Sequence, residues 1–224
     1  TGKIGHASMI YTLEGVTGSS LSAIKSWFML DDHIVILIAD INSTDSSPVE
    51  TIIENRQINP DSNPYFQVDG YEIPISATQQ LSSATWAHLS NESNTAPIGY
   101  VFLTPCELLA ENVSREGAWS SINDGGSSET VTEQYATLSV PHGQMPKSES
   151  LIYAILPNYT PEETQHYQRS PAVRIVCNDV TCQAIATQNN EIWGGNFYQA
   201  GQQENIQALT SGAILIHHGE TGVT

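Results

Sequence analysis

Basic residues are scarce in this sequence. Its 224 residues include three lysines and four arginines, against 24 acidic residues, and the formal net charge is −17. A surface with this charge repels phosphate backbones, so nucleic acid is excluded as an expected partner.

Long apolar runs are also missing. The longest, Ile34–Ala39, is far shorter than the roughly 20 residues that a membrane helix needs, so no membrane partner is expected. The chain does not open on a basic segment followed by an apolar one, and we do not expect a signal-bearing precursor. Apolar residues still make up 39% of the chain, which is enough for a globular protein with a sizeable core.

Cysteine is rare too, with three residues, and no Cys/His spacing fits zinc, so neither a metal nor a cofactor is expected. Cys177 and Cys182 flank a short turn-like segment; they could form a disulfide across it or remain two buried thiols on adjacent strands. Cys106 is expected to be a structural thiol. Nucleophile-elbow, P-loop and dinucleotide-binding motifs are absent, and no pair of acids stands out for glycoside hydrolysis.

The sequence contains instead many short strand-like segments separated by turn residues. The expected strands are Ser8–Leu13, Ser22–Leu30, Ile34–Ile41, Val49–Gln57, Tyr65–Val68, Ala84–Leu89, Ile98–Leu103, Tyr135–Val140, Ser150–Leu156, Val173–Val176, Thr181–Ala186, Ile192–Tyr198 and Ala213–His217. With so little helical periodicity, this spacing predicts an all-β protein of antiparallel sheets.

Two hairpins and one helix are predicted most clearly. Asp31-Asp32 should turn the chain into the apolar run Ile34–Ala39, whose continuity favours a strand covered on both faces. Asp69-Gly70 suits a type I′ turn. Thr160 can cap a helix over Pro161–Arg169. We therefore predict a first unit over residues 1–160, a linker over 161–170 and a small second unit over 171–224.

Several segments resemble polysaccharide lyase family 8, whose members cleave hyaluronan, chondroitin or xanthan. The Lys-Ser-Trp-Phe run and Asp-Asp turn within Ser22–Ile41, followed by Thr51–Arg56, stand in the family's order. Further similar segments are Ile98–Leu103, Gly117–Asn123, Tyr135–Gly143, Tyr153–Asn158 and Cys177–Ala186. The resemblance implies the later part of an antiparallel β-supersandwich followed by a small C-terminal β-sandwich.

The resemblance also implies that the catalytic residues lie in a different part of the protein. Family lyases act by β-elimination: the uronate carboxylate is neutralised, C5 loses a proton and the 4-linked sugar leaves. The Asn, Arg, Tyr and His that do this sit mainly on an N-terminal helical toroid, and no position here matches them. We therefore expect no catalytic residue in this chain, and the toroid as partner, in the same chain or a separate one. The alternative is a non-catalytic carbohydrate-binding or structural β-sandwich module.

An acidic polysaccharide is the expected ligand, although the net charge opposes it. Arg56, next to Asn55 at a strand end, is either a salt-bridge partner of Glu50 or Glu54, the simpler interpretation, or a glycan contact. His142, after a strand and before a glycine, could lie at a groove rim. These three residues, Asn55, Arg56 and His142, are the predicted substrate contacts.

Tryptophans and glycosylation sequons complete the candidates. Trp27, Trp86, Trp119 and Trp193 could stack on sugars but are more typical of cores, and Trp119 is predicted to anchor an ordered loop. The glycosylation candidates are Asn42, Asn91, Asn112 and Asn158. Few lysines, many Ser/Thr residues and these sequons favour a secreted, extracellular protein.

Overall fold

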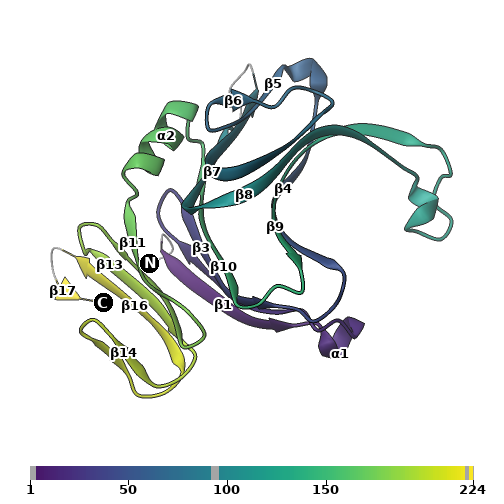
Figure 1. Cartoon of the computed structure of the whole chain (residues 1–224). Coiled ribbons are helices and arrows are strands. Elements are labelled where there is room, and N and C mark those ends of the chain that lie inside the picture. Colours follow the sequence, from purple (N-terminus) through teal and green to yellow (C-terminus); the bar gives the residue numbers. More distant parts are fainter. Residues whose placement is uncertain (1–3, 92–95, 220–221, 224) are drawn as a thin grey trace.

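The computed structural model describes residues 4–91, 96–219 and 222–223, and antiparallel β-structure predominates in this part of the chain (Figure 1). The first sheet comprises β1 (Gly5–Thr12), β2 (Ser22–Met29), β3 (Ile34–Asn42), β4 (Pro48–Ile58), β5 (Pro64–Val68), β6 (Tyr71–Glu72), β7 (Ala77–Asn91), β8 (Ile98–Gly117), β9 (Val131–Gln144) and β10 (Glu149–Pro157). Its order is β1-β2-β3-β10-β8-β7-β5-β6, with β9 joining β8 to β4.

The second sheet comprises β11 (Val173–Asn178), β12 (Cys182–Thr187), β13 (Ile192–Phe197), β16 (Gly212–Gly219) and β17 (Gly222–Val223), with a separate hairpin of β14 (Gly201–Gln203) and β15 (Ile206–Ala208). The helical segments are α1 (Glu14–Thr17), η1 (Pro60–Ser62), η2 (Trp119–Ser121) and α2 (Pro161–Arg169). None of the helices in the described ranges is long and apolar enough to cross a membrane. The expected all-β fold is confirmed.

β3 is covered on both faces, as its unbroken apolar sequence predicted. Ile36 and Ile38 enter the core of the first unit, whereas Val35 and Leu37 enter a second apolar cluster on the other face. Side chains alternate across a strand, so a run with no polar position needs two apolar neighbours. The Asp31-Asp32 turn connects β2 to β3 with Met29 opposite Ile34.

The longest strand, β8, turns a corner. Its first part pairs with β10 and the end of β7, and its second part pairs with the start of β7 and with β9. Exposed Pro105 lies at the corner, where the β7–β8 register shifts twice. Proline lacks the N–H that a ladder needs and is tolerated at such irregularities. Beyond the corner, β8 and β9 leave the body of the molecule as a curved extension (Figure 1), the β8–β9 arm, residues 113–135.

The helix α2 begins and ends where the sequence predicted. Thr160 accepts a hydrogen bond from the Glu163 N–H at 3.2 Å, and the Glu163 carboxylate accepts from the Thr160 N–H at 2.8 Å, which forms a capping box. Thr164 is fully buried, and its side chain occupies the space beside Gly99 of β8. The segment predicted as a linker is thus packed against the first sheet.

The two sheets meet through apolar and polar contacts. Phe28 and Leu37 share an apolar cluster with Ile185 of β12. Beside it, buried Gln183 accepts a hydrogen bond from Ser26 Oγ at 2.6 Å. The small second unit therefore shares part of its apolar packing with the first sheet and has a separate cluster of its own around Trp193 and Phe197.

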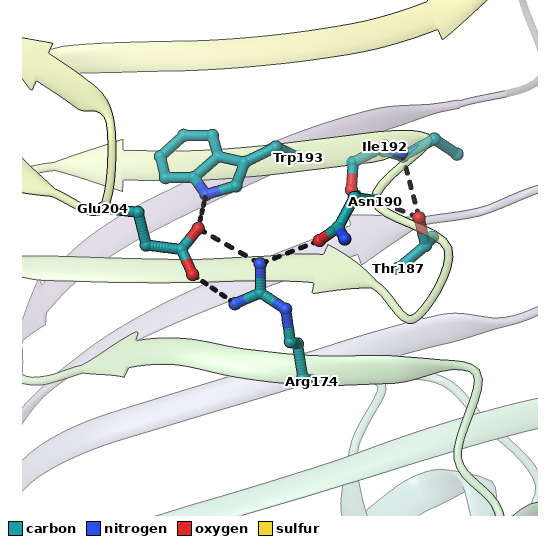
Figure 2. Close-up of polar contacts among 6 residues, drawn as sticks. All are labelled: Arg174, Thr187, Asn190, Ile192, Trp193 and Glu204. Atoms are coloured by element: carbon teal, nitrogen blue, oxygen red, sulfur yellow. Dashed lines mark hydrogen bonds and ion pairs between the residues drawn. The ribbon is translucent and has the colours of Figure 1, made fainter.

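A polar network holds the β14–β15 hairpin against the second sheet (Figure 2). Glu204, in the hairpin turn, accepts from Arg174 of β11 and from Trp193 Nε1 of β13 at 3.2 Å. Arg174 also donates to Asn190 Oδ1 at 3.0 Å. The hydrogen bond from Arg174 is the main cause that lowers the pKa of Glu204 below its usual value. The Glu204 carboxylate thus links the β14–β15 turn to both β11 and β13.

Candidate functional site

The predicted contacts Asn55 and Arg56 are neighbours on β4 and project to opposite faces of the strand. Arg56 forms an ion pair with Glu54 at 2.9 Å, the simpler of the two interpretations that its sequence allowed. Glu54 also accepts a hydrogen bond from the buried Tyr100 hydroxyl, whose pKa is raised by burial. The Glu54 carboxylate therefore offsets much of the positive charge of Arg56. Arg56 also lines a cleft together with Ser90.

Asn55 belongs to a different environment, at the base of the β8–β9 arm. Its Oδ1 accepts from Arg115 Nη1 at 2.8 Å and from Thr137 Oγ1 at 3.1 Å. The Arg115 guanidinium lies 5.3 Å from the centre of the Tyr135 ring, a cation–π distance. These contacts fix Asn55 in a cleft of about 600 Å³.

His142 lies apart from both. Its Nε2 is 2.8 Å from the Thr51 hydroxyl, and burial lowers the pKa of His142 despite the opposing effect of Glu149. Thr51 and Arg56 are five residues apart on β4, about 16 Å in an extended strand. The structure therefore does not gather Asn55, Arg56 and His142 into one site.

The glycosylation prediction is wrong at Asn112. This side chain is 2% exposed on the inner face of β8. Its Nδ2 donates to the Ile73 carbonyl at 3.0 Å, and its Oδ1 accepts from Gln134 at 2.8 Å. A buried amide with both ends in use has no room for a glycan.

The other sequons differ in access. The Asn42 amide is half-buried and bonded at both ends, to the Asp40 carbonyl at 2.9 Å and to the Ser148 N–H at 2.8 Å. Asn158 is exposed, between β10 and α2. Asn91 ends β7, and its sequon continues outside the described residues.

The cysteines take structural positions. Cys177 and Cys182 are joined in a disulfide between β11 and β12, with Cα atoms 5.9 Å apart. Cys106 is a free, half-buried thiol. Burial raises the pKa of this thiol to about 12, which opposes a nucleophilic role at neutral pH. Within the described ranges, no three His, Cys, Asp or Glu side chains are grouped to hold a metal ion.

Sequence reasoning missed the residues that surround Asn55, and it misjudged Trp119. The Trp119 loop is ordered, as expected, but Trp119 is 61% exposed, so its contribution to the loop comes from backbone hydrogen bonds and not from a buried side chain. Spacing alone could have grouped Glu133, Tyr135 and Thr137, since alternate residues share one face of β9. Their pairing with Asn55 and Arg115 on neighbouring strands depends on the register.

Both parts of the chain match models of one family. Residues 1–168 match the super-sandwich domain of polysaccharide lyase family 8, and residues 174–224 match its C-terminal beta-sandwich domain. The xanthan lyase of Bacillus sp. (strain GL1) is 34% identical over 184 residues, covering 80% of this chain and 20% of that protein. The hyaluronate lyase of Thermasporomyces composti is 32% identical over 195 residues, covering 86% and 24%.

A solved structure extends the similarity to the whole chain. The Paenibacillus xanthan lyase superimposes with a TM-score of 0.91 at 29% identity, over 98% of this chain and 21% of that one. This chain thus spans about a fifth to a quarter of the length of these relatives. By these matches and by its two β-units, the chain belongs to polysaccharide lyase family 8.

Proposed function

We propose that this chain is the C-terminal β-portion of a secreted polysaccharide lyase that cleaves uronic-acid-containing glycans by β-elimination. The catalytic groups lie on an N-terminal helical portion outside this chain, in the same polypeptide or a separate one. The observation that carries the proposal is the match of both β-units to consecutive domains of one lyase family.

The proposed role of this portion is to brace the catalytic part and to form one wall of the glycan cleft. Arg56 can donate to uronate or hydroxyl oxygens, because its side chain is 40% exposed despite the ion pair with Glu54. Asn55 can contact sugar hydroxyls from the other face of β4. Since His142 is half-buried and distant from Arg56, it serves better as a support for β4 through Thr51.

Secretion is part of the proposal. Disulfides persist in oxidising compartments, and the Cys177–Cys182 bond supports an extracellular location. We also propose the division into residues 1–160, a connecting segment 161–170 and residues 171–224. The packing of α2 on β8 makes that segment a fixed joint between the two units.

The test is the ultraviolet absorbance of unsaturated uronate when the whole protein that carries this chain is mixed with hyaluronan, chondroitin or xanthan. Absorbance should rise with at least one polymer, and the 224-residue chain alone should give none. The carbohydrate-binding module becomes the better interpretation under two conditions: this chain alone binds glycan, and a protein of greater length that contains it yields no product. Product from the chain alone would contradict the placement of the catalytic groups.

The contribution of Arg56 can be tested separately. Arg56→Ala should raise KM about tenfold and change kcat little, because a remote charged hydrogen bond contributes about 1.5 kcal/mol or more to binding. Arg169→Ala is the matched control, since Arg169 is exposed on α2. Equal kinetics for both variants would exclude Arg56 as a substrate contact.

A further inference from the structure

We propose that the base of the β8–β9 arm is a second glycan-binding site, which takes a neutral pyranose unit of the polysaccharide on the ring of Trp119. This inference depends on the proposed function in one respect, namely that the bound sugar unit belongs to the polysaccharide that the lyase cleaves. The site consists of Trp119, Ile122, Arg115, Tyr135 and Asn55, which line one cleft.

Trp119 is held in an exposed position by its own loop. Ser120 N–H donates to the Ser127 carbonyl at 3.0 Å, and Asn123 N–H donates to the Trp119 carbonyl at 3.0 Å. Gly126 packs so closely that a Cβ there would lie 2.7 Å from the Trp119 backbone. The backbone is therefore fixed while Trp119 remains 61% exposed, which presents a large aromatic side chain at little cost in ordering.

The cleft has the chemistry of a sugar site. Ile122, 79% exposed, and Val131 add apolar side chains to the lining of the cleft that contains Trp119, and Asn55 and Gln57 add amide groups. The C–H face of a pyranose stacks on an aromatic ring, and its hydroxyls need donors and acceptors at the rim. Ligand sites commonly combine an apolar wall with a few oriented polar groups, in volumes of about 300–1,000 Å³. The cleft, at about 600 Å³, lies within this range.

Charge selects a neutral unit over a uronate. Arg115, the cation lining this cleft, already contacts Asn55 and Thr137 and lies 3.5 Å from Glu111. Glu116 and Glu133 line the same cleft. A sugar carboxylate would therefore meet two carboxylates and an engaged guanidinium, whereas a neutral ring meets no such repulsion.

The test is calorimetric titration of the protein with two neutral oligosaccharides, cellohexaose and hexa-N-acetylchitohexaose. At least one should bind, and Trp119→Ala should weaken that binding about three- to tenfold, the range for losing one aromatic contact. Trp119→Phe keeps a ring and should recover part of the affinity. Tyr71→Ala is the control, because Tyr71 is 72% exposed on β6, away from the arm, and should leave the affinity unchanged.

Two results would overturn the inference: no binding of either oligosaccharide, or equal affinity for wild type and Trp119→Ala. Lower thermal stability of Trp119→Ala with unchanged affinity would identify the arm as a contact to the rest of the protein instead. The uronate product assay on the same preparation keeps the proposals separate. Failure to cleave any polymer refutes the proposed function, whereas the titration alone decides the Trp119 site.

Discussion

Replacing Gln183 with leucine should destabilise the joint between the two sheets. The Gln183 side chain is fully buried; its Oε1 accepts from Ser26 and Tyr198, and its Nε2 donates to Asn178 Oδ1 at 2.8 Å and to the Leu37 carbonyl at 3.2 Å. Leucine has a similar volume, so the effect isolates the hydrogen bonds from the packing.

The magnitude follows from which groups lose their partners. Ser26 and Tyr198 remain 3.0 Å apart and can bond to each other. The Asn178 oxygen and the Leu37 and Ile24 carbonyls lose a donor, and each group left unsatisfied costs about 1–3 kcal/mol. We expect a loss of about 2–4 kcal/mol, or roughly 5–15 °C in Tm for a chain of this size.

Urea unfolding followed by tryptophan fluorescence measures this loss. Gln207→Leu is the control: Gln207 is exposed on β15, and its replacement should change the free energy of unfolding by less than about 0.5 kcal/mol. A loss below about 1 kcal/mol for Gln183→Leu would refute the reasoning, because it would mean that the buried network adds no net stability.

Three further predictions concern packing, pH and glycosylation. Gly99→Ala should cost about 1–3 kcal/mol in urea unfolding, because its Cβ would lie 2.2 Å from Thr164 Oγ1, whereas Gly117→Ala has open space and should cost far less. Burial lowers the pKa of His88 below 6.5, so stability should fall as pH drops below about 6.5, and less steeply in His88→Gln, in unfolding measured from pH 8 to 5. Expression in a eukaryotic secretory host should add a glycan at exposed Asn158, seen as extra mass that Asn158→Gln removes.

The fold was predictable where a local signal and the tertiary environment agree. The Asp69-Gly70 turn has φ values of 50° and 84°, both positive as a type I′ turn requires, and joins Val68 to Tyr71. The capping box fixed both the position and the start of α2. The outer parts of β7, β8 and β9 were missed, since many of their residues are polar and their strand structure depends on long pairings with neighbouring strands.

The candidate site was less predictable, because it depends on faces and registers. Nothing local in the sequence says that Asn112 faces the core while Asn158 faces solvent. Trp86 and Trp119 look alike as residues, yet Trp86 is buried in β7 and Trp119 is exposed in a closed loop. Only the pairing of β9 with both β4 and β8 brings Arg115 and Tyr135 to Asn55.

The scarcity of basic residues now has a structural consequence for substrate binding. Three of the four arginines form ion pairs, Arg56 with Glu54, Arg115 with Glu111 and Arg174 with Glu204. Each pair nearly cancels its own field beyond a few ångströms, so the described part of the chain offers little net positive potential to a polyuronate. In the proposed lyase, the charge that neutralises a uronate carboxylate must then come largely from the catalytic portion outside this chain. Uronate binding by the whole protein should therefore weaken with salt, while neutral-sugar binding at Trp119 should not.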